Sequence, residues 1–304
     1  MKKSMFRKMS KGDIVFVCIN SMLLILFAAI TLYPFLFVVS ASLSDPSAVS
    51  AGKMWLFPVD LTLQGYEFIF KYDEIWSGYY NTIIYTVFGT IFSLFLTVPC
   101  AYAVSRRDMK GRGLLMVFFM ITMYISGGMI PGYLNVQSLG LLNSRVYMII
   151  AGGVSVYNLI VARTFFSSSI PWELHEAARI DGATDFCIFF NIVLPLSKPI
   201  LVVLMLYYGV AQWNTYFTAM LYLSDRAKFP LQLILRDILI NSQISATQIE
   251  GLTQEQLTEI FKQEKTANLL KYSVIVVSSL PMLIVYPWLQ KFFQKGVMIG
   301  SVKG

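Results

Sequence analysis

The sequence predicts an all-α, polytopic membrane protein with six transmembrane helices, and three observations carry that prediction. Of its 304 residues, 56% are hydrophobic and only 13% are charged, whereas soluble domains carry about 25% charged residues. Six apolar segments are long enough to cross a bilayer, which takes roughly 20 helical residues. Lysine and arginine gather in alternate connections between those segments, as cytoplasmic loops require.

The six predicted spans follow one another with connections of unequal length. They are Ile14–Val39, Tyr80–Val104, Leu114–Leu134, Val146–Ala162, Ile200–Leu223 and Tyr272–Phe292. Prolines 34, 99, 281 and 287 fall inside them, which a bundle tolerates because neighbouring helices satisfy the freed carbonyls. The basic N-terminus resembles a signal peptide, but the first apolar run exceeds the roughly 7–15 residues of a signal core. We therefore expect a retained first helix.

The distribution of positive charge predicts that both chain ends are cytoplasmic. Segments 1–13, 105–113 and 163–199 and the C-terminal tail hold most of the lysines and arginines. This gives a cytoplasmic N-terminus (1–13), a single transmembrane domain (14–292) and a cytoplasmic tail (293–304). The extracytoplasmic loops would be 41–78 and 224–268. The net charge of +7 is thereby explained without nucleic acid as a partner.

The predicted spans are almost free of Asp, Glu, Lys, Arg and His, since Lys291, next to the end of the last span, is the only such residue in them. Ion-coupled transporters usually need ionisable groups within the membrane, so secondary transport is disfavoured, although backbone carbonyls could still bind sodium. The sequence also lacks the phosphate-binding pattern GxxxxGK[ST], which ATP-hydrolysing subunits use. Energy for active transport would therefore come from another polypeptide.

An intramembrane enzyme is also disfavoured. The stretch HEAAR at His175–Arg179 approaches the zinc motif HExxH, but a cation stands where the second ligand belongs, and the chain has one histidine. A zinc site therefore cannot be completed. A Ser-His hydrolase would need the same histidine, which lies in a predicted cytoplasmic loop far from any outside serine. We expect no catalytic residue and no metal site, and we place His175 on the exposed face of a polar helix.

The most ordered polar segment lies between the fourth and fifth predicted spans, in residues 167–198, which we call the elbow. Pro171 and the acids Glu173 and Glu176 suit the start of a helix, and Gly182 suits the left-handed turn that ends one. A second short helix is expected over Thr184–Val193. Two short helices around a tight turn would fit a cleft in a partner. The alternative is an ordinary amphipathic surface helix.

The elbow resembles the EAA loop of binding-protein-dependent ABC importers. That pattern is EAA, three residues, Gly, nine residues, Ile, one residue, Leu-Pro. Here Glu176-Ala177-Ala178, Gly182, Ile192 and Leu194-Pro195 stand at those positions. Other stretches, such as QWNTYF (212–217) and KGVMIGSVKG (295–304), are similar to the carbohydrate-uptake branch. The chain is similar to the smaller permease of maltose-type importers, and especially to Gram-positive permeases for plant or uronate-containing oligosaccharides.

This resemblance implies a permease subunit in the bacterial cell membrane that performs no covalent chemistry. It implies a second related permease, two cytoplasmic ATPases that hold ATP and Mg²⁺, an extracytoplasmic solute-binding lipoprotein and an oligosaccharide substrate, with membrane lipid around the spans. In that family the EAA segment is the coupling helix, which docks into a groove of the ATPase. The corresponding residues here are Glu176, Ala177, Ala178, Arg179, Asp181 and Gly182. We expect Arg179 to brace the elbow against its own acids.

Sugars are held by aromatic faces and by amide or hydroxyl groups, so the candidates for the substrate path are Tyr157, Asn158, Trp213, Asn214 and Tyr216. Alternatively, Trp and Tyr mark membrane interfaces and Asn joins helices. The turn Arg106–Arg112 is expected to set topology, with anionic lipid contact as a second role. The outside loops would receive the binding protein or simply pack as loops.

Two other functions stay open. The chain could be a non-transporting membrane sensor of the same ancestry, or an ion-coupled secondary transporter.

Overall fold

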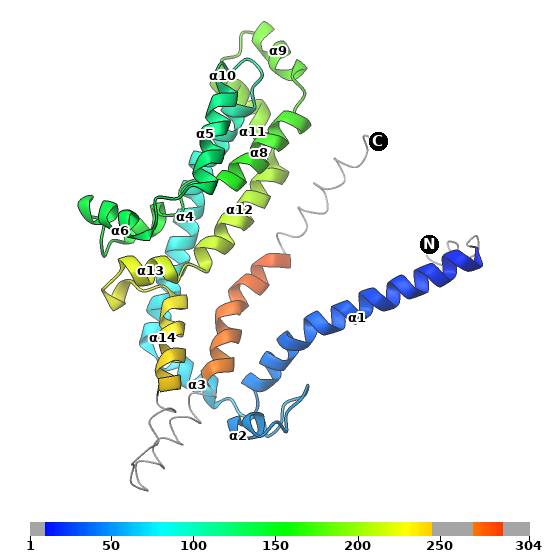
Figure 1. Ribbon diagram of the computed structural model, residues 1–304, viewed down its shortest axis with the longest axis vertical. Helices are drawn as coiled ribbons and strands as arrows, with labels where there is room; N and C mark the ends of the chain where they lie inside the picture. Colours follow the sequence, from blue (N-terminus) through cyan, green and yellow to red (C-terminus); the bar gives the residue numbers. More distant parts are fainter. Residues whose placement is uncertain (1–9, 245–269, 288–304) are drawn as a thin grey trace. The chain divides into compact units, whose positions relative to one another are not determined.

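The computed structural model describes residues 10–244 and 270–287 (Figure 1). This part of the chain is built from helices and contains no strand, which confirms the all-α fold class. The predicted tail 293–304, most of the predicted N-terminal segment and most of loop 224–268 lie outside the described residues. The chain divides into two compact units, Met1–Lys71 with Ile238–Val277 and Tyr72–Asp237 with Ser278–Gly304.

The first unit contains α1 (Lys11–Ser42), α2 (Pro46–Ser50) and α3 (Gln64–Phe70). The most apolar stretch of α1 has no buried residue, which suits a helix that faces lipid. Asp45 accepts a hydrogen bond from the Ser47 amide at 2.9 Å, and Pro46 occupies the first position of α2, the arrangement that starts helices. The Ser42 and Tyr66 hydroxyls, 2.6 Å apart, join α1 to α3.

The second unit is organised around α4 (Asp73–Ser105), against which α8 (Val156–Ser169) and α12 (Lys198–Trp213) pack. Ala101, Leu159 and Leu204 are fully buried where these helices meet. The same core includes Ala178 and Val193 of the elbow. The elbow therefore packs against these helices through buried side chains. Between residues 72 and 237 and outside the elbow, the unit also contains α5 (Arg112–Tyr124), α6 (Met129–Ser138), α7 (Arg145–Ile150), α13 (Phe217–Tyr222), the 3-10 turn η4 (Arg226–Lys228) and the start of α14 (Leu231–Ile244).

Three predicted spans are not continuous helices. The segment Leu114–Leu134 forms α5 and α6, which are bent by 109° at a break. Gly128 in that break has φ of 88°, a backbone conformation that glycine adopts freely. Pro131, in the first turn of α6, has no amide hydrogen to continue a helix from the preceding residues.

The other two interruptions fall in the fourth and fifth predicted spans. Val146–Ala162 forms α7 and α8, separated by residues 151–155, where Gly152-Gly153 weakens the helix. The Ser155 hydroxyl then accepts from the Asn158 amide and begins α8. Ile200–Leu223 forms α12 and α13, with the break at residues 214–216.

In length and composition, three helices of the described chain could cross a membrane: Gly12–Ser42, α4 and Leu270–Pro287. The number rises to five if two bent pairs, α5 with α6 and Asp185–Leu196 with α12, each form one span. The first two helices cover the first two predicted spans. Residues 288–292 of the sixth lie outside the described residues, and the total of six stays a prediction.

Substitution of Gly78 tests the close packing of α4 against α14. A Cβ at this position would lie 3.1 Å from the Leu231 Cα and 2.6 Å from the Ile234 Cδ1. Gly78→Ala should destabilise the protein by about 1–3 kcal/mol because overpacking displaces backbone, and thermal unfolding of the purified protein measures it. In the control Gly209→Ala, the nearest atom lies 3.8 Å away, so stability should stay or rise. Equal losses in both variants would contradict this packing account.

Candidate functional site

The first half of the elbow folds into the helix and tight turn that the sequence predicts. α9 (Glu173–Ile180) carries Glu173 and Glu176 in its first turn. Gly182 follows with φ of 78°, and its amide donates to the Arg179 carbonyl at 3.0 Å. The Ala183 amide donates to the Ala178 carbonyl at 2.9 Å. This pair of bonds is the Schellman motif, which satisfies the last carbonyls of a helix.

The second half is a helix that continues past its predicted end. It consists of α10 (Asp185–Cys187), a π-helical turn at Ile188–Val193 and α11 (Leu194–Leu196). Thr184 caps it by accepting from the Cys187 amide at 3.3 Å. The wider π turn precedes Pro195, whose missing amide would otherwise interrupt the helix. The helix therefore runs to Leu196 before the chain bends by 79° into α12.

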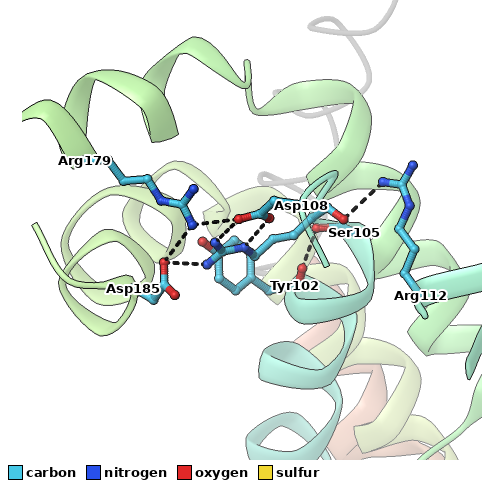
Figure 2. Close-up of polar contacts among 7 residues, drawn as sticks. Tyr102, Ser105, Asp108, Arg112, Arg179 and Asp185 are labelled. Carbon is cyan, nitrogen blue, oxygen red and sulfur yellow. Dashed lines mark hydrogen bonds and ion pairs between the residues drawn. The ribbon is translucent and has the colours of Figure 1, made fainter. Parts of the chain in front are cut away.

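Four charged side chains fasten the elbow to the turn between α4 and α5, and we call them the ion cluster (Figure 2). Arg106, the C-cap of α4, forms two hydrogen bonds to Asp108 at 2.9 and 2.6 Å. Its Nη1 lies 2.7 Å from Asp185 Oδ1. Arg179 Nη2 lies 2.6 Å from Asp108 Oδ2 and 3.6 Å from Asp185 Oδ1. Arg179 thus contacts Asp185 within the elbow and, more closely, Asp108 outside it.

The ion cluster shifts the pKa values of its members in the direction that keeps them charged. Hydrogen bonds from Arg106 hold the pKa of Asp108 and of Asp185 below the usual range. The bond to Asp108 in turn raises the pKa of Arg106. Both carboxylates are therefore ionised at neutral pH, when each can attract both arginines.

The predicted coupling residues divide between surface and core. Glu176, Ala177, Arg179, Asp181 and Gly182 are exposed, whereas Ala178 is buried. Among the exposed apolar side chains of the elbow, Ile180 at 87% and Phe186 at 77% are the most exposed. The sequence reasoning missed them, although Ile180 lies four residues after Glu176, on the same helical face. An exposed apolar patch with charges around it is typical of a protein interface.

His175 is buried, so the prediction that it is exposed was wrong. Only 6% of it is exposed, because its ring stacks on Trp172 at 4.9 Å and on Tyr102 of α4 at 5.9 Å between centroids. Burial lowers its pKa, and the nearby Pro171 carbonyl offsets this in part. Neither ring nitrogen has a partner with hydrogen-bond geometry among the described residues. The histidine instead packs the elbow onto α4.

A second candidate site is a cavity of about 690 Å³ next to α8 and α12. Tyr157, Asn158 and Asn214 of the predicted substrate path line it, and the described lining residues include no charged side chain. Trp213 and Tyr216 do not line it. Trp213 is buried and its Nε1 donates to the Ser278 carbonyl at 3.2 Å, while Tyr216 is exposed beside Phe217.

The sequence reasoning missed most of the polar wall of this cavity. That wall also contains Ser155, Tyr207, Tyr208, Gln212, Thr215 and Thr218. Tyr208 accepts from the Ser155 amide at 3.1 Å, and its hydroxyl lies 2.6 Å from that of Thr97. Tyr208 and Gln212 stand four residues apart on an otherwise apolar helix, a spacing that places them on one face and could have revealed the wall.

Comparison with known proteins identifies the family to which the chain belongs. A family model described as "Binding-protein-dependent transport system inner membrane component" matches residues 75–299. The chain belongs to this family. It is a membrane permease component, and its homologues are permease subunits and not enzymes.

Individual relatives match this permease along nearly its whole length. It is 44% identical over 281 residues to the polygalacturonan/rhamnogalacturonan transport system permease protein YtcP of Bacillus subtilis, covering 92% of this chain and 96% of the relative. It is 29% identical to the melibiose/raffinose/stachyose import permease protein MelC of the same species, covering 89% and 91%. A chain in the crystal structure of a bacterial ABC transporter involved in import of the acidic polysaccharide alginate matches with TM-score 0.81 and 35% identity, covering 94% of this chain and 99% of that one.

Asp108→Asn tests whether the ion cluster holds the elbow, because it removes the acid that lies closer to each arginine, at 2.6 Å from both. We expect amide hydrogens of α9 to exchange about two- to fivefold faster, the effect of an ion pair worth roughly 0.5–1 kcal/mol, measured by hydrogen–deuterium exchange. Because the pKa of each acid is lowered, its pairing contributes fully above the ordinary pKa of about 3.9 and weakens only as pH falls below that value.

The matched control is Asp181→Asn, since Asp181 is an exposed acid of the same elbow with no salt bridge in the described chain. Its exchange should match that of the unmodified protein. If amide exchange in α9 accelerated equally in the two variants, the ion cluster would not be what holds the elbow.

Proposed function

We propose that this chain is a permease subunit of an ATP-driven, binding-protein-dependent importer of oligosaccharides, and that its substrates are acidic fragments of plant polysaccharides. The observation that carries the proposal is near-full-length similarity, at 44% and 35% identity, to proteins named for two acidic polysaccharide systems. The relative named for neutral melibiose, raffinose and stachyose is less similar, at 29%. The hydroxyls, amides and aromatic rings around the cavity are groups that can hold sugar hydroxyls.

In the mechanism we propose, the elbow carries motion from a cytoplasmic ATPase to the helices that surround the cavity. Its exposed tip, with Glu176, Ile180 and Phe186, would seat in a groove of the ATPase. The ion cluster and buried residues such as Ala178 and Val193 join the elbow to α4, α8 and α12. Because α8 and α12 also line the cavity, displacement of the elbow would change the cavity's access.

The proposed assembly contains a second related permease, two ATPases that bind ATP and Mg²⁺, and an extracytoplasmic solute-binding lipoprotein. Both chain ends and the elbow would then be cytoplasmic. A well-anchored surface on the other side supports a docking role there. Arg226 of η4 forms hydrogen bonds to Glu74 at 3.1 and 2.7 Å, and Asn81 donates to the Ala227 and Phe229 carbonyls at 2.9 and 3.1 Å.

Uptake into vesicles that carry the complete complex separates this proposal from the alternatives. Uptake of a labelled acidic oligosaccharide should require ATP and persist when ion gradients are collapsed. Uptake that follows the ion gradient would indicate a secondary transporter. Binding of the loaded lipoprotein without uptake under either condition would indicate a sensor.

Glu176→Lys tests the proposed docking of the elbow. The variant should insert into the membrane in normal amount but lose ATP hydrolysis stimulated by the loaded binding protein, because reversing an interfacial charge places like charges together. Glu173→Lys is the control, since it makes the same change one turn earlier at another exposed acid. Normal stimulation in Glu176→Lys would rule out the docking role.

Tyr157→Ala tests the cavity as the sugar path. Losing one aromatic contact should lower uptake at limiting oligosaccharide by about threefold to tenfold, while stimulated ATP hydrolysis continues. Tyr216→Ala removes a similarly exposed tyrosine outside the cavity and should leave uptake unchanged. If both variants transport like the unmodified protein, the sugar contacts lie elsewhere.

A further inference from the structure

A small basic pocket of about 310 Å³ lies beside the elbow and is separate from the uncharged cavity. Its wall includes Arg106, Arg107, Arg112 and Arg163, and the described residues around it contribute no carboxylate. Several like charges around one small volume repel one another unless an anion lies between them. The charge of the pocket is therefore the feature that needs explanation.

The ion cluster neutralises only one of these arginines. Arg106 pairs with Asp108 and Asp185, whereas Arg107, Arg112 and Arg163 form no salt bridge within the described chain. The pocket therefore keeps a net positive charge of several units at neutral pH, since a guanidinium does not lose its proton in proteins.

Two of the unpaired arginines are already oriented by the backbone. Arg112 Nη1 donates to the Arg106 carbonyl at 3.1 Å (Figure 2), and Arg163 Nε donates to the Val104 carbonyl at 3.4 Å. These carbonyls lie at the C-terminal end of α4, where cations are favoured. A guanidinium has five N–H donors, so each side chain is held by one bond and keeps others for a ligand.

A buried group with unused hydrogen-bonding capacity completes the wall. His175 lines the pocket, is 94% buried, and has no partner with hydrogen-bond geometry at either ring nitrogen among the described residues. Buried polar groups are nearly always paired, and an unpaired one is unfavourable. Ser105 and Ser167 also line the pocket, but their hydroxyls already donate to the Tyr102 and Arg163 carbonyls at 2.7 and 2.6 Å, so the free donors come from the arginines and His175.

We propose that this pocket binds the phosphate group of an anionic membrane lipid. Phosphate oxygens match the paired donors of arginine, and basic pockets between transmembrane helices at the cytoplasmic boundary suit lipid head groups. The pocket lies where the apolar helix α4 ends. α5 starts beside it at Arg112 with the exposed apolar residues Leu114 and Leu115, along which acyl chains can lie. A free phosphate ion offers the same oxygens without acyl chains.

This proposal goes beyond the proposed function and does not require it, since lipid binding is measured without transport. It does predict a link to the elbow. Arg106 and His175 belong both to the pocket wall and to the contacts that hold the elbow on α4. A bound phosphate would therefore stabilise the same contacts.

The test is lipid retention by the purified full-length chain with its partner subunits, in nanodiscs of phosphatidylcholine with phosphatidylglycerol, read by native mass spectrometry. The double variant Arg112→Gln/Arg163→Gln should retain at least about fivefold less phosphatidylglycerol for each charge removed. Arg112→Lys/Arg163→Lys keeps the charges and should retain most of it. Lys110→Gln removes a charge from the same turn outside the pocket and should retain it fully.

A second pair of variants leaves every arginine in place. Ser167→Asp adds an anion at the pocket and should lower retention, whereas Ser168→Asp adds the same charge one residue away, outside the pocket, and should not. Equal retention across all pocket and control variants would overturn the proposal. Saturable binding of inorganic phosphate that depends on Arg112 and Arg163, with no retained lipid, would overturn the assignment to lipid.

Discussion

One guanidinium, that of Arg106, joins the end of α4 to the elbow through Asp108 and Asp185. Exposed ion pairs contribute little to stability, but the Arg106 side chain is only 12% exposed and is part of a network with Arg179. Breaking such a network would leave a largely buried charge without a partner, which is strongly unfavourable. The network is also directional, since two bonds to Asp108 fix the plane of the guanidinium. Arg106 therefore orients the elbow, while buried Ala178, Val193 and His175 pack it on the helices.

Two of the three interruptions in the predicted spans, at residues 151–155 and 214–216, lie beside the cavity. Gly152 and Ser155 in the break before α8, and Asn214 and Thr215 in the break after α12, all line it. Backbone that is not helical is tolerated at membrane depth only where protein buries it or a cavity supplies water. Glycine also makes room there, because a Cβ at Gly89 or Gly152 would lie 2.5 or 2.8 Å from the Gln212 amide nitrogen. Broken helices and a polar wall are thus one feature, and ligand contacts can come from backbone as well as side chains.

The sequence was sufficient for what local chemistry determines. Apolar length predicts α1 and α4, and Gly182 predicts the turn of the elbow because few other residues accept its φ. It was insufficient where distant segments meet. Arg179 and Asp108 are 71 positions apart, and no local pattern pairs them. His175 is buried because Tyr102 and Trp172 cover its ring. The three broken spans were missed because average hydrophobicity hides glycine pairs and an asparagine within apolar runs. Most of these failures fall at the elbow or the cavity, where local preference yields to function.

The arginines around the end of α4 have a structural role that a count of positive charges does not reveal. To set the orientation of a span in the membrane, positive charge need only lie near one of its ends. Flexible, solvated lysines would be sufficient for that role. Here the arginines are fixed instead: Arg106 by two carboxylates, and Arg112 and Arg163 by carbonyls at the end of α4. Their fixed positions lower the entropy that is lost when an anion binds. If these arginines only set the orientation of the chain in the membrane, they would not need a buried histidine, His175, beside them with both ring nitrogens unpaired. The geometry thus points to a ligand and not to topology alone.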